Sequence, residues 1–163
     1  MIKSTLQFRI LIILMAISLS AAAQKDKTTV LEICPVFITD TVSSNNFFIE
    51  FQPSTIKVYR SKGGLVVRIE QKEQFFTLLF NKNNLKNSKY KVDSYANSKK
   101  EVAAKYSFRI GSQVSYVNMT SGAVETNFNK ETSLWHIKVN GLLSNYIGPS
   151  VTYFKVKAEF YIP

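Results

Sequence analysis

Few side chains in this sequence could act in nucleophilic or acid–base catalysis. The chain has 163 residues with one histidine, His136, and one cysteine, Cys34. A Ser-His-Asp or Cys-His mechanism would therefore have a single candidate base. No G-x-S-x-G nucleophile elbow occurs in the sequence. Trp135 and Ile137 flank His136 in an alternating strand pattern, so we interpret the histidine as a solvent-facing strand residue and Cys34 as a buried thiol.

Carboxylates need separate consideration, because two of them can hydrolyse a glycosidic bond without any local motif. Each candidate falls in a loop or at an outward position of an alternating strand, where an ordinary solvated carboxylate is expected. We therefore predict a protein that is not an enzyme, with a secreted glycoside hydrolase that uses dispersed carboxylates as one alternative. The candidates for that alternative are Glu50, Glu70, Asp93, Glu125 and Glu159.

Motifs for metals and cofactors are missing from the sequence. The three aspartates, Asp26, Asp40 and Asp93, are scattered, and one cysteine with one histidine cannot form a structural zinc set. Glycine-rich motifs that bind phosphate are also absent. We predict neither a metal site nor a cofactor.

A basic stretch with interleaved tyrosines is the strongest chemical signal. It runs from Lys82 to Arg109, and its only acidic residues are Asp93 and Glu101. Clustered cations beside aromatic rings can bind anionic polymers by charge and by stacking. The alternative is that the lysines keep loops soluble and prevent strand edges from pairing. The candidate anion- or glycan-binding residues are Lys86, Lys89, Tyr90, Lys91, Tyr95, Lys99 and Lys100.

The first 23 residues have the pattern of a secretory signal peptide. Lys3 and Arg9 precede the apolar run 10–17, and Ala21 and Ala23 form an A-x-A site. The apolar run is shorter than the roughly 20 residues that a membrane span needs. We predict cleavage after Ala23 and export to the periplasm, the outer-membrane surface or the exterior, in a bacterial setting rather than a eukaryotic one.

The remaining residues, 24–163, are predicted to form a single domain. Without the leader the chain keeps 19 basic residues against 11 acidic ones. An exported basic protein meets anionic glycans and envelope surfaces rather than intracellular nucleic acid, so these are the expected partners. With one cysteine, an internal disulfide is excluded, and a dimer linked through Cys34 is a minor alternative.

Strands must position these residues, and the last segment shows them most clearly. From Val151 to Ile162 the side chains alternate, with Phe154, Val156 and Phe160 on one face and lysines, tyrosines and Glu159 on the other. Shorter runs upstream repeat the alternation, with turn residues between them. Ser98 and Glu101 have the spacing of a capping box, so one short helix near 98–105 is the most helix that we expect.

The fold class predicted from these patterns is all-β. We expect an antiparallel β-sandwich of about 8–10 short strands, with a small closed, lipocalin-like β-barrel as the alternative. The predicted function is that of an exported, non-catalytic β-module that binds or packs against an envelope or extracellular partner. A small outer-membrane β-barrel is a further alternative, although most runs of five to seven residues are shorter than the 9–11 that such a barrel needs.

Overall fold

A computed structural model describes residues 27–82 and 84–163 as an all-β chain. The predicted signal peptide, 1–23, lies outside the described residues. These ranges contain ten strands and no helix, so the predicted all-β class is confirmed. In chain order the strands are β1 (Lys27–Leu31), β2 (Val36–Asp40), β3 (Ser54–Ser61), β4 (Gly64–Gln71), β5 (Gln74–Phe80), β6 (Ser88–Val92), β7 (Glu101–Ile110), β8 (Gln113–Asn129), β9 (Leu134–Ile147) and β10 (Ser150–Ile162).

All ten strands belong to one hydrogen-bonded sheet. Their order is β1-β3-β4-β5-β7-β6-β8-β9-β10-β2, and β7 also pairs with β8. Nine of the ten neighbouring pairs are antiparallel, whereas β6 and β7 pair in parallel. The expectation of a purely antiparallel arrangement is therefore wrong. The reason is that β6 is inserted between the N-terminal half of β7 and the C-terminal half of β8, where the two long strands separate.

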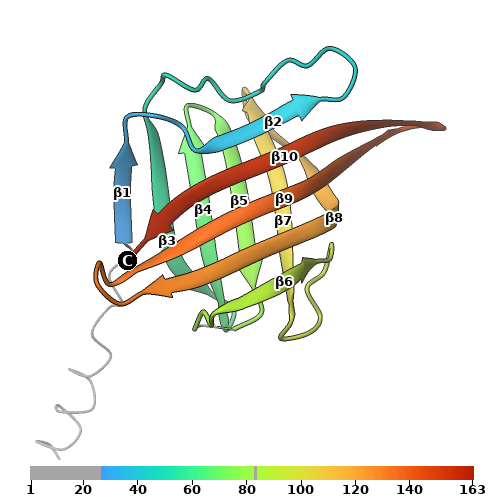
Figure 1. Ribbon diagram of the computed structural model, residues 1–163. Helices are drawn as coiled ribbons and strands as arrows, with labels where there is room; N and C mark the ends of the chain where they lie inside the picture. The colour runs from blue at the N-terminus through green and yellow to red at the C-terminus, as the bar shows by residue number, and fades with distance from the viewer. Residues whose placement is uncertain (1–26, 83) are drawn as a thin grey trace, which may run out of the picture.

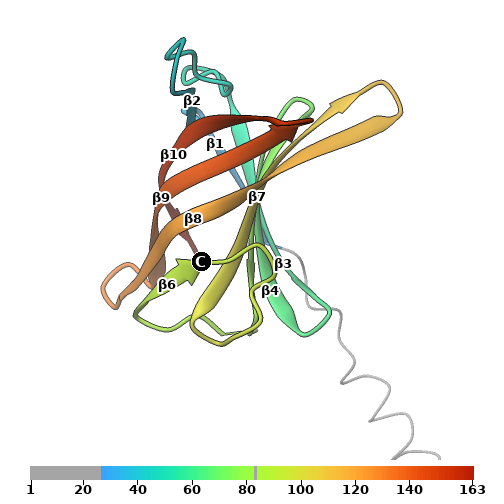
Figure 2. The same ribbon diagram turned by 90° about the vertical axis from the view of Figure 1, so that its right-hand side faces the viewer.

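The sheet curls into a half-barrel around an apolar core. In Figure 1, β2 and β8–β10 cross in front of β3, β4, β5 and β7, and Figure 2 shows the same curl from the side. Because side chains alternate along a strand, each strand contributes one face to the interior. On β10, Val156, Ala158, Phe160 and Ile162 are buried and Phe154 is half-buried, as the sequence predicts. Neither a sandwich nor a closed barrel is confirmed.

Strands β7, β8 and β9 are longer than the sequence predicts, at 10, 17 and 14 residues, whereas β10, at 13 residues, matches the predicted Val151–Ile162 to within one residue. The sequence of Thr120–Gly122 predicts a turn, and that of Asn140–Gly141 predicts a hairpin turn or a bulge. Both segments lie inside strands, β8 and β9, with Gly122 opposite Gly141 and a register shift between Met119 and Ser121. A Cβ atom at Gly141 would collide with the Met119 side chain and the Ser121 carbonyl oxygen. These glycines therefore allow a close backbone approach at a bulge rather than a reversal of the chain.

The short helix considered near 98–105 does not form, and residues from Glu101 onward belong to β7. The capping contact itself is present, because the Ser98 backbone N–H donates a hydrogen bond to Glu101 Oε2 at 2.9 Å. However, Val102 and Ala104 are buried and Lys105 is exposed, so the residues after the turn follow the two-residue period of a strand. Burial of alternate apolar residues in the half-barrel outweighs the local helix signal.

The two edges of the sheet are β1 and β2, and the loop of residues 41–53 spans one mouth of the half-barrel. Phe48 from this loop is fully buried in the core. The loop is held by Gln71, whose amide nitrogen donates to the Ile49 carbonyl at 2.7 Å and whose amide oxygen accepts from the Ile49 N–H at 2.8 Å. The loop is thus an integral wall of the fold.

Candidate functional site

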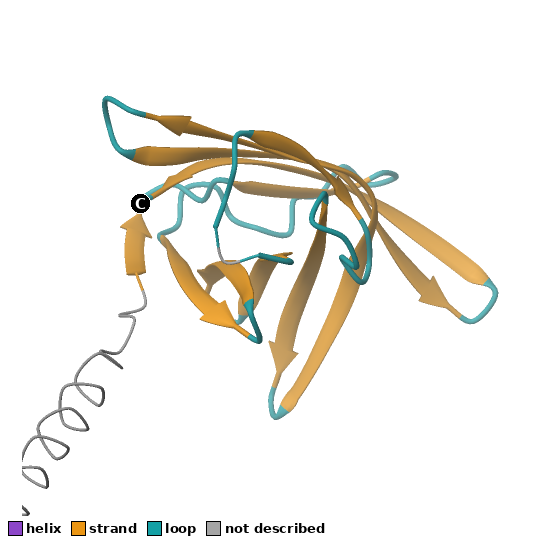
Figure 3. Ribbon diagram, turned by 90° about the horizontal axis from the view of Figure 1, so that it is seen from below, coloured by secondary structure: helices purple, strands orange, loops and turns teal. Residues whose placement is uncertain are grey.

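Four lysines converge on a small pocket at the mouth of the half-barrel opposite the 41–53 loop. β5 ends at this mouth, which Figure 3 shows from below. The pocket has a volume of about 240 Å³. It is lined by Phe80, Asn81, Lys82, Asn84, Lys86, Ser88, Tyr90, Lys99 and Lys100.

The backbone around the first two lysines is fixed by hydrogen bonds. The Lys82 carbonyl accepts a bond from the Leu65 N–H at 3.2 Å. The Lys86 N–H donates to the Tyr90 hydroxyl at 3.2 Å, and the Lys86 carbonyl accepts from the buried Thr126 hydroxyl at 2.5 Å. The loop between β5 and β6 is therefore held on both sides of Lys86, while the lysine side chains remain exposed.

The other two lysines lie in the turn before β7. The Lys100 N–H donates to Ser98 Oγ at 3.3 Å, and the Lys100 carbonyl accepts a bond from the Lys91 N–H at 2.9 Å. With the bond from Ser98 to Glu101, these contacts fix the turn that presents Lys99 and Lys100 to the pocket.

The pocket lysines carry uncompensated positive charge. The neighbouring Lys99 ammonium, with smaller contributions from desolvation and from Lys86, lowers the pKa of Lys82 below its ordinary value. The ion pairs formed among the described residues involve other cations, and none includes Lys82, Lys86, Lys99 or Lys100. Like charges held together without a counter-charge favour binding of an anion between them.

Four of the seven residues predicted from the sequence line this pocket, and three do not. Lys86, Tyr90, Lys99 and Lys100 are brought together, and Lys82 joins them. Lys82 is the first residue of the basic stretch but is not one of the seven candidates. Lys82 joins the pocket because the loop after β5 meets the turn that carries Lys99 and Lys100, which are distant in sequence.

The three remaining candidates lie elsewhere on the surface. Lys89 points outward from β6 and forms an ion pair of 2.9 Å with Glu125, whose pKa it lowers by hydrogen bonding and charge. Lys91 is exposed on the same strand, and Tyr95 is exposed in the following loop. Cross-strand pairing thus neutralises Lys89, which the sequence alone could not reveal.

Tyr90 has a structural role in the pocket wall. Its ring is buried and packs edge-on against Phe80, with ring centroids 5.2 Å apart. Its face is therefore not available for stacking on a sugar or a base, which was the reason for including it among the candidates. Its hydroxyl instead orients the backbone of Lys86.

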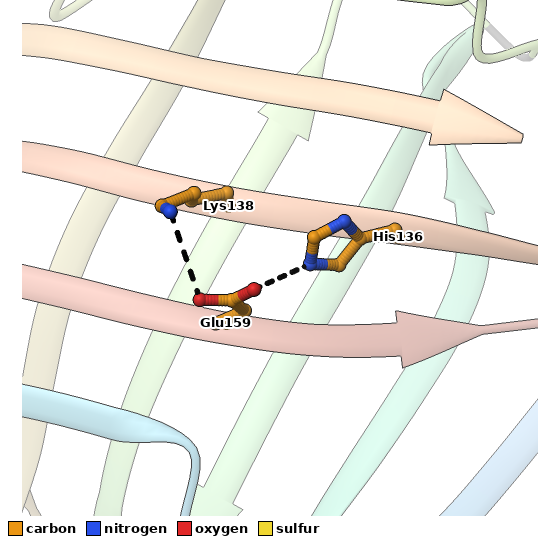
Figure 4. A network of polar contacts seen from close by, with 3 residues as sticks. All are labelled: His136, Lys138 and Glu159. Carbon is orange, nitrogen blue, oxygen red and sulfur yellow. Dashed lines mark hydrogen bonds and ion pairs between the residues drawn. The ribbon is translucent and has the colours of Figure 1, made fainter.

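Three of the carboxylates considered for hydrolysis are held in ion pairs. Glu70 lies 2.6 Å from Lys57, and Glu125 is paired with Lys89. Glu159 on β10 contacts His136 at 2.8 Å and Lys138 at 3.9 Å, both on β9, as Figure 4 shows. This network lies on the outer face of the sheet, which confirms the outward orientation predicted for His136.

A larger open groove of about 1090 Å³ lies where the sheet is not closed, between β1 and the C-terminal end of β10. Glu50 and Glu159 both line it, together with Lys138 and Lys157. Cys34 is one of its lining residues, with a fully buried side chain as predicted, and burial raises the pKa of this thiol. The charged lining of this groove is mixed, whereas the lining of the lysine pocket includes no carboxylate.

Comparisons with protein-family models, curated proteins and solved structures found no match for this chain. Across the part of the chain that the structure describes, no three His, Cys, Asp or Glu side chains are grouped to hold a metal ion. No helix in that part is long and apolar enough to cross a membrane. The candidate site therefore rests on its own geometry.

Proposed function

We propose that this chain is an exported, non-catalytic β-module that binds an anionic group of an envelope or extracellular partner through the lysine pocket. The observation that carries the proposal is the convergence of Lys82, Lys86, Lys99 and Lys100 on one pocket without a paired carboxylate. A sulfate, phosphate or carboxylate on a glycan or an envelope surface has the matching charge.

The size and rigidity of the pocket support this ligand class. A volume of about 240 Å³ suits one anionic substituent rather than a whole polymer segment. The backbone of Lys86 and Lys100 is already fixed, so an anion would order the lysine side chains without also ordering the loops. Preorganisation of this kind lowers the entropic cost of binding.

For the architecture, we infer a barrel-like form rather than a sandwich. The support is the continuous order of ten strands around one apolar interior. Small barrels commonly bind ligands at their mouths, where loops meet above a rigid wall. The lysine pocket occupies such a position at the end of β5.

Calorimetric titration with a sulfated oligosaccharide, and with its unsulfated counterpart as ligand control, tests the proposal. A triple variant, Lys82→Gln, Lys86→Gln and Lys99→Gln, removes three pocket charges. The matched control, Lys27→Gln, Lys72→Gln and Lys155→Gln, removes three exposed charges that lie outside the pocket. Both variants have the same net charge, so a difference between them reports the location of the site.

The proposal predicts salt-dependent binding of the sulfated ligand to the unmodified protein. The pocket variant is expected to bind at least about tenfold more weakly, a loss of about 1.4 kcal/mol, and the control variant much less so. Equal weakening in the two variants would mean that only overall charge matters, and absence of binding at low salt would refute the proposal.

A further inference from the structure

A second hollow lies at the other mouth of the half-barrel, beneath the 41–53 loop. Its volume is about 340 Å³, within the range of about 300–1,000 Å³ typical of small-molecule sites. The hollow and the lysine pocket lie at opposite ends of β5. The terminal residues of that strand, Gln74 and Phe80, are about 20 Å apart at the usual rise of a β-strand. The lining residues are Ile38, Phe47, Tyr106, Phe108, Val117, Leu143, Asn145 and Phe154.

Aromatic side chains from three different segments form the walls of this hollow. Phe47 comes from the loop, stacks on Tyr106 of β7 with ring centroids 5.8 Å apart, and meets Phe154 of β10 edge-on at 5.2 Å. Phe108 lies 5.7 Å from Tyr106 along the same strand. Phe47 remains over a third exposed, whereas its neighbour Phe48 is fixed in the core. Phe47 is therefore the wall residue nearest to solvent.

The lining is uncharged. The Tyr106 hydroxyl donates a hydrogen bond to Gln74 Oε1 at 2.9 Å, and burial raises the pKa of this phenol to about 12. Asn145 supplies the one side-chain amide in the lining, and this amide can both donate and accept a hydrogen bond. A charged group placed here would lose its hydration without gaining a counter-charge. An apolar group would instead bury its surface against four aromatic rings.

We infer that this aromatic mouth, defined as the lining of the 340 Å³ hollow, binds a small uncharged apolar molecule whose one polar group hydrogen-bonds to Asn145. The molecule enters beside Phe47 and rests against Tyr106 and Phe154. This site is independent of the lysine pocket, since it lies at the opposite mouth and uses no charge.

Fluorescence titration with N-phenyl-1-naphthylamine, an uncharged probe that brightens in apolar surroundings, tests this inference on the full mature chain. Val117→Phe fills the hollow from β8, and Asn145→Phe closes it from β9. Val114→Phe, on β8 but exposed and outside the lining, is the matched control. Thermal unfolding establishes that each variant is folded. Val117 and Asn145 are both half-buried, and the Asn145→Phe variant keeps the test valid even where Val117→Phe does not fold.

The inference predicts saturable binding at one site, insensitive to salt, that is weakened at least about tenfold by Val117→Phe and by Asn145→Phe and by no more than about twofold by Val114→Phe. Three results would overturn it. These are absence of saturable binding to the unmodified protein, unchanged binding in the folded Asn145→Phe variant, and equal loss in the Val114→Phe control.

Discussion

Tyr106 has a hydroxyl that is both buried and hydrogen-bonded, and this makes its ionisation a sensitive reporter of the fold. Its pKa is about 12 in the folded protein, against an ordinary value of 10. A raised pKa stabilises the folded state below the unfolded-state pKa, and this stabilisation is lost as the pH rises through the folded-state value. The relevant window is therefore pH 10 to 12.

Replacing Tyr106 by phenylalanine is expected to cost about 1 kcal/mol at pH 7, because Gln74 loses its hydrogen-bond donor. Between pH 10 and 12 the unmodified protein should lose about 2 to 3 kcal/mol relative to the variant, so the order of stability reverses. Urea unfolding of both proteins across this range measures the difference. A constant difference at every pH would contradict the burial assigned to Tyr106.

Cys34 is expected to be unreactive in the native protein, because its thiol is fully buried and its pKa is raised by desolvation. A chromogenic disulfide reagent at pH 8 should label one thiol per chain rapidly in denaturant and far more slowly without it. The same burial disfavours a dimer linked through Cys34. Rapid labelling of the native protein would show that the segment joining β1 to β2 opens readily.

Within the pocket, the Lys82 ammonium is repelled by those of Lys99 and Lys86. Its lowered pKa means that the folded state binds this proton less tightly than the unfolded chain does, so Lys82 weakens stability below that pKa. Lys82→Gln is therefore expected to leave the midpoint of thermal unfolding unchanged or slightly raised at low salt, with the difference vanishing at high salt. A lower midpoint for the variant would mean that Lys82 has a structural partner.

At the scale of elements, the close pairing of β8 and β9 at their bulge depends on two opposed glycines. Gly141→Ala is expected to destabilise the protein by about 1–3 kcal/mol, because the new methyl group collides with Met119 and the Ser121 carbonyl. Gly148→Asn is the control, since that turn position has a positive φ with open space around it, and asparagine tolerates such a φ. Urea unfolding distinguishes the two, and equal effects would contradict the close approach.

The same elements show how far the sequence could predict the fold. Period-two alternation identified the inner face of β10, because a strand with one buried face leaves that pattern. Local pattern reading failed at Gly122, where a turn signal lies inside a long strand, although the hairpin-or-bulge signal at Asn140–Gly141 does lie beside a bulge. It also failed at Ser98 and Glu101, where a capping contact precedes a strand. In both places tertiary contacts outweigh a local signal.

At the scale of the whole molecule, the lysine pocket is formed where separate segments meet at one mouth of the half-barrel, and no single segment contains it. Composition predicted Lys86, Lys99 and Lys100, because they belong to one basic stretch. It could not separate them from Lys89, since that lysine is neutralised by Glu125 across a strand pair far apart in sequence. The aromatic mouth was not predicted, because its walls come from five strands and a loop.

The two mouths divide the molecule into a basic end and an apolar end, with a solid core of fully buried side chains such as Ile69, Phe76 and Leu78 between them. Because the core is closely packed, binding at one mouth is expected to leave affinity at the other unchanged. Titrating the sulfated oligosaccharide with and without saturating N-phenyl-1-naphthylamine measures this coupling. A change in affinity of more than about threefold would show that the core transmits it.

The most direct test of the central claim is to locate the bound anion by amide chemical-shift mapping of residues 24–163 at low salt. Titration with the sulfated oligosaccharide is predicted to shift the signals of residues 80–82, 84–88 and 98–101 most strongly, because these segments carry the pocket lysines. The shifts should saturate together. Small shifts spread over all exposed lysines, or strong shifts confined to the groove between β1 and β10, would contradict the assignment of the lysine pocket as the anion site.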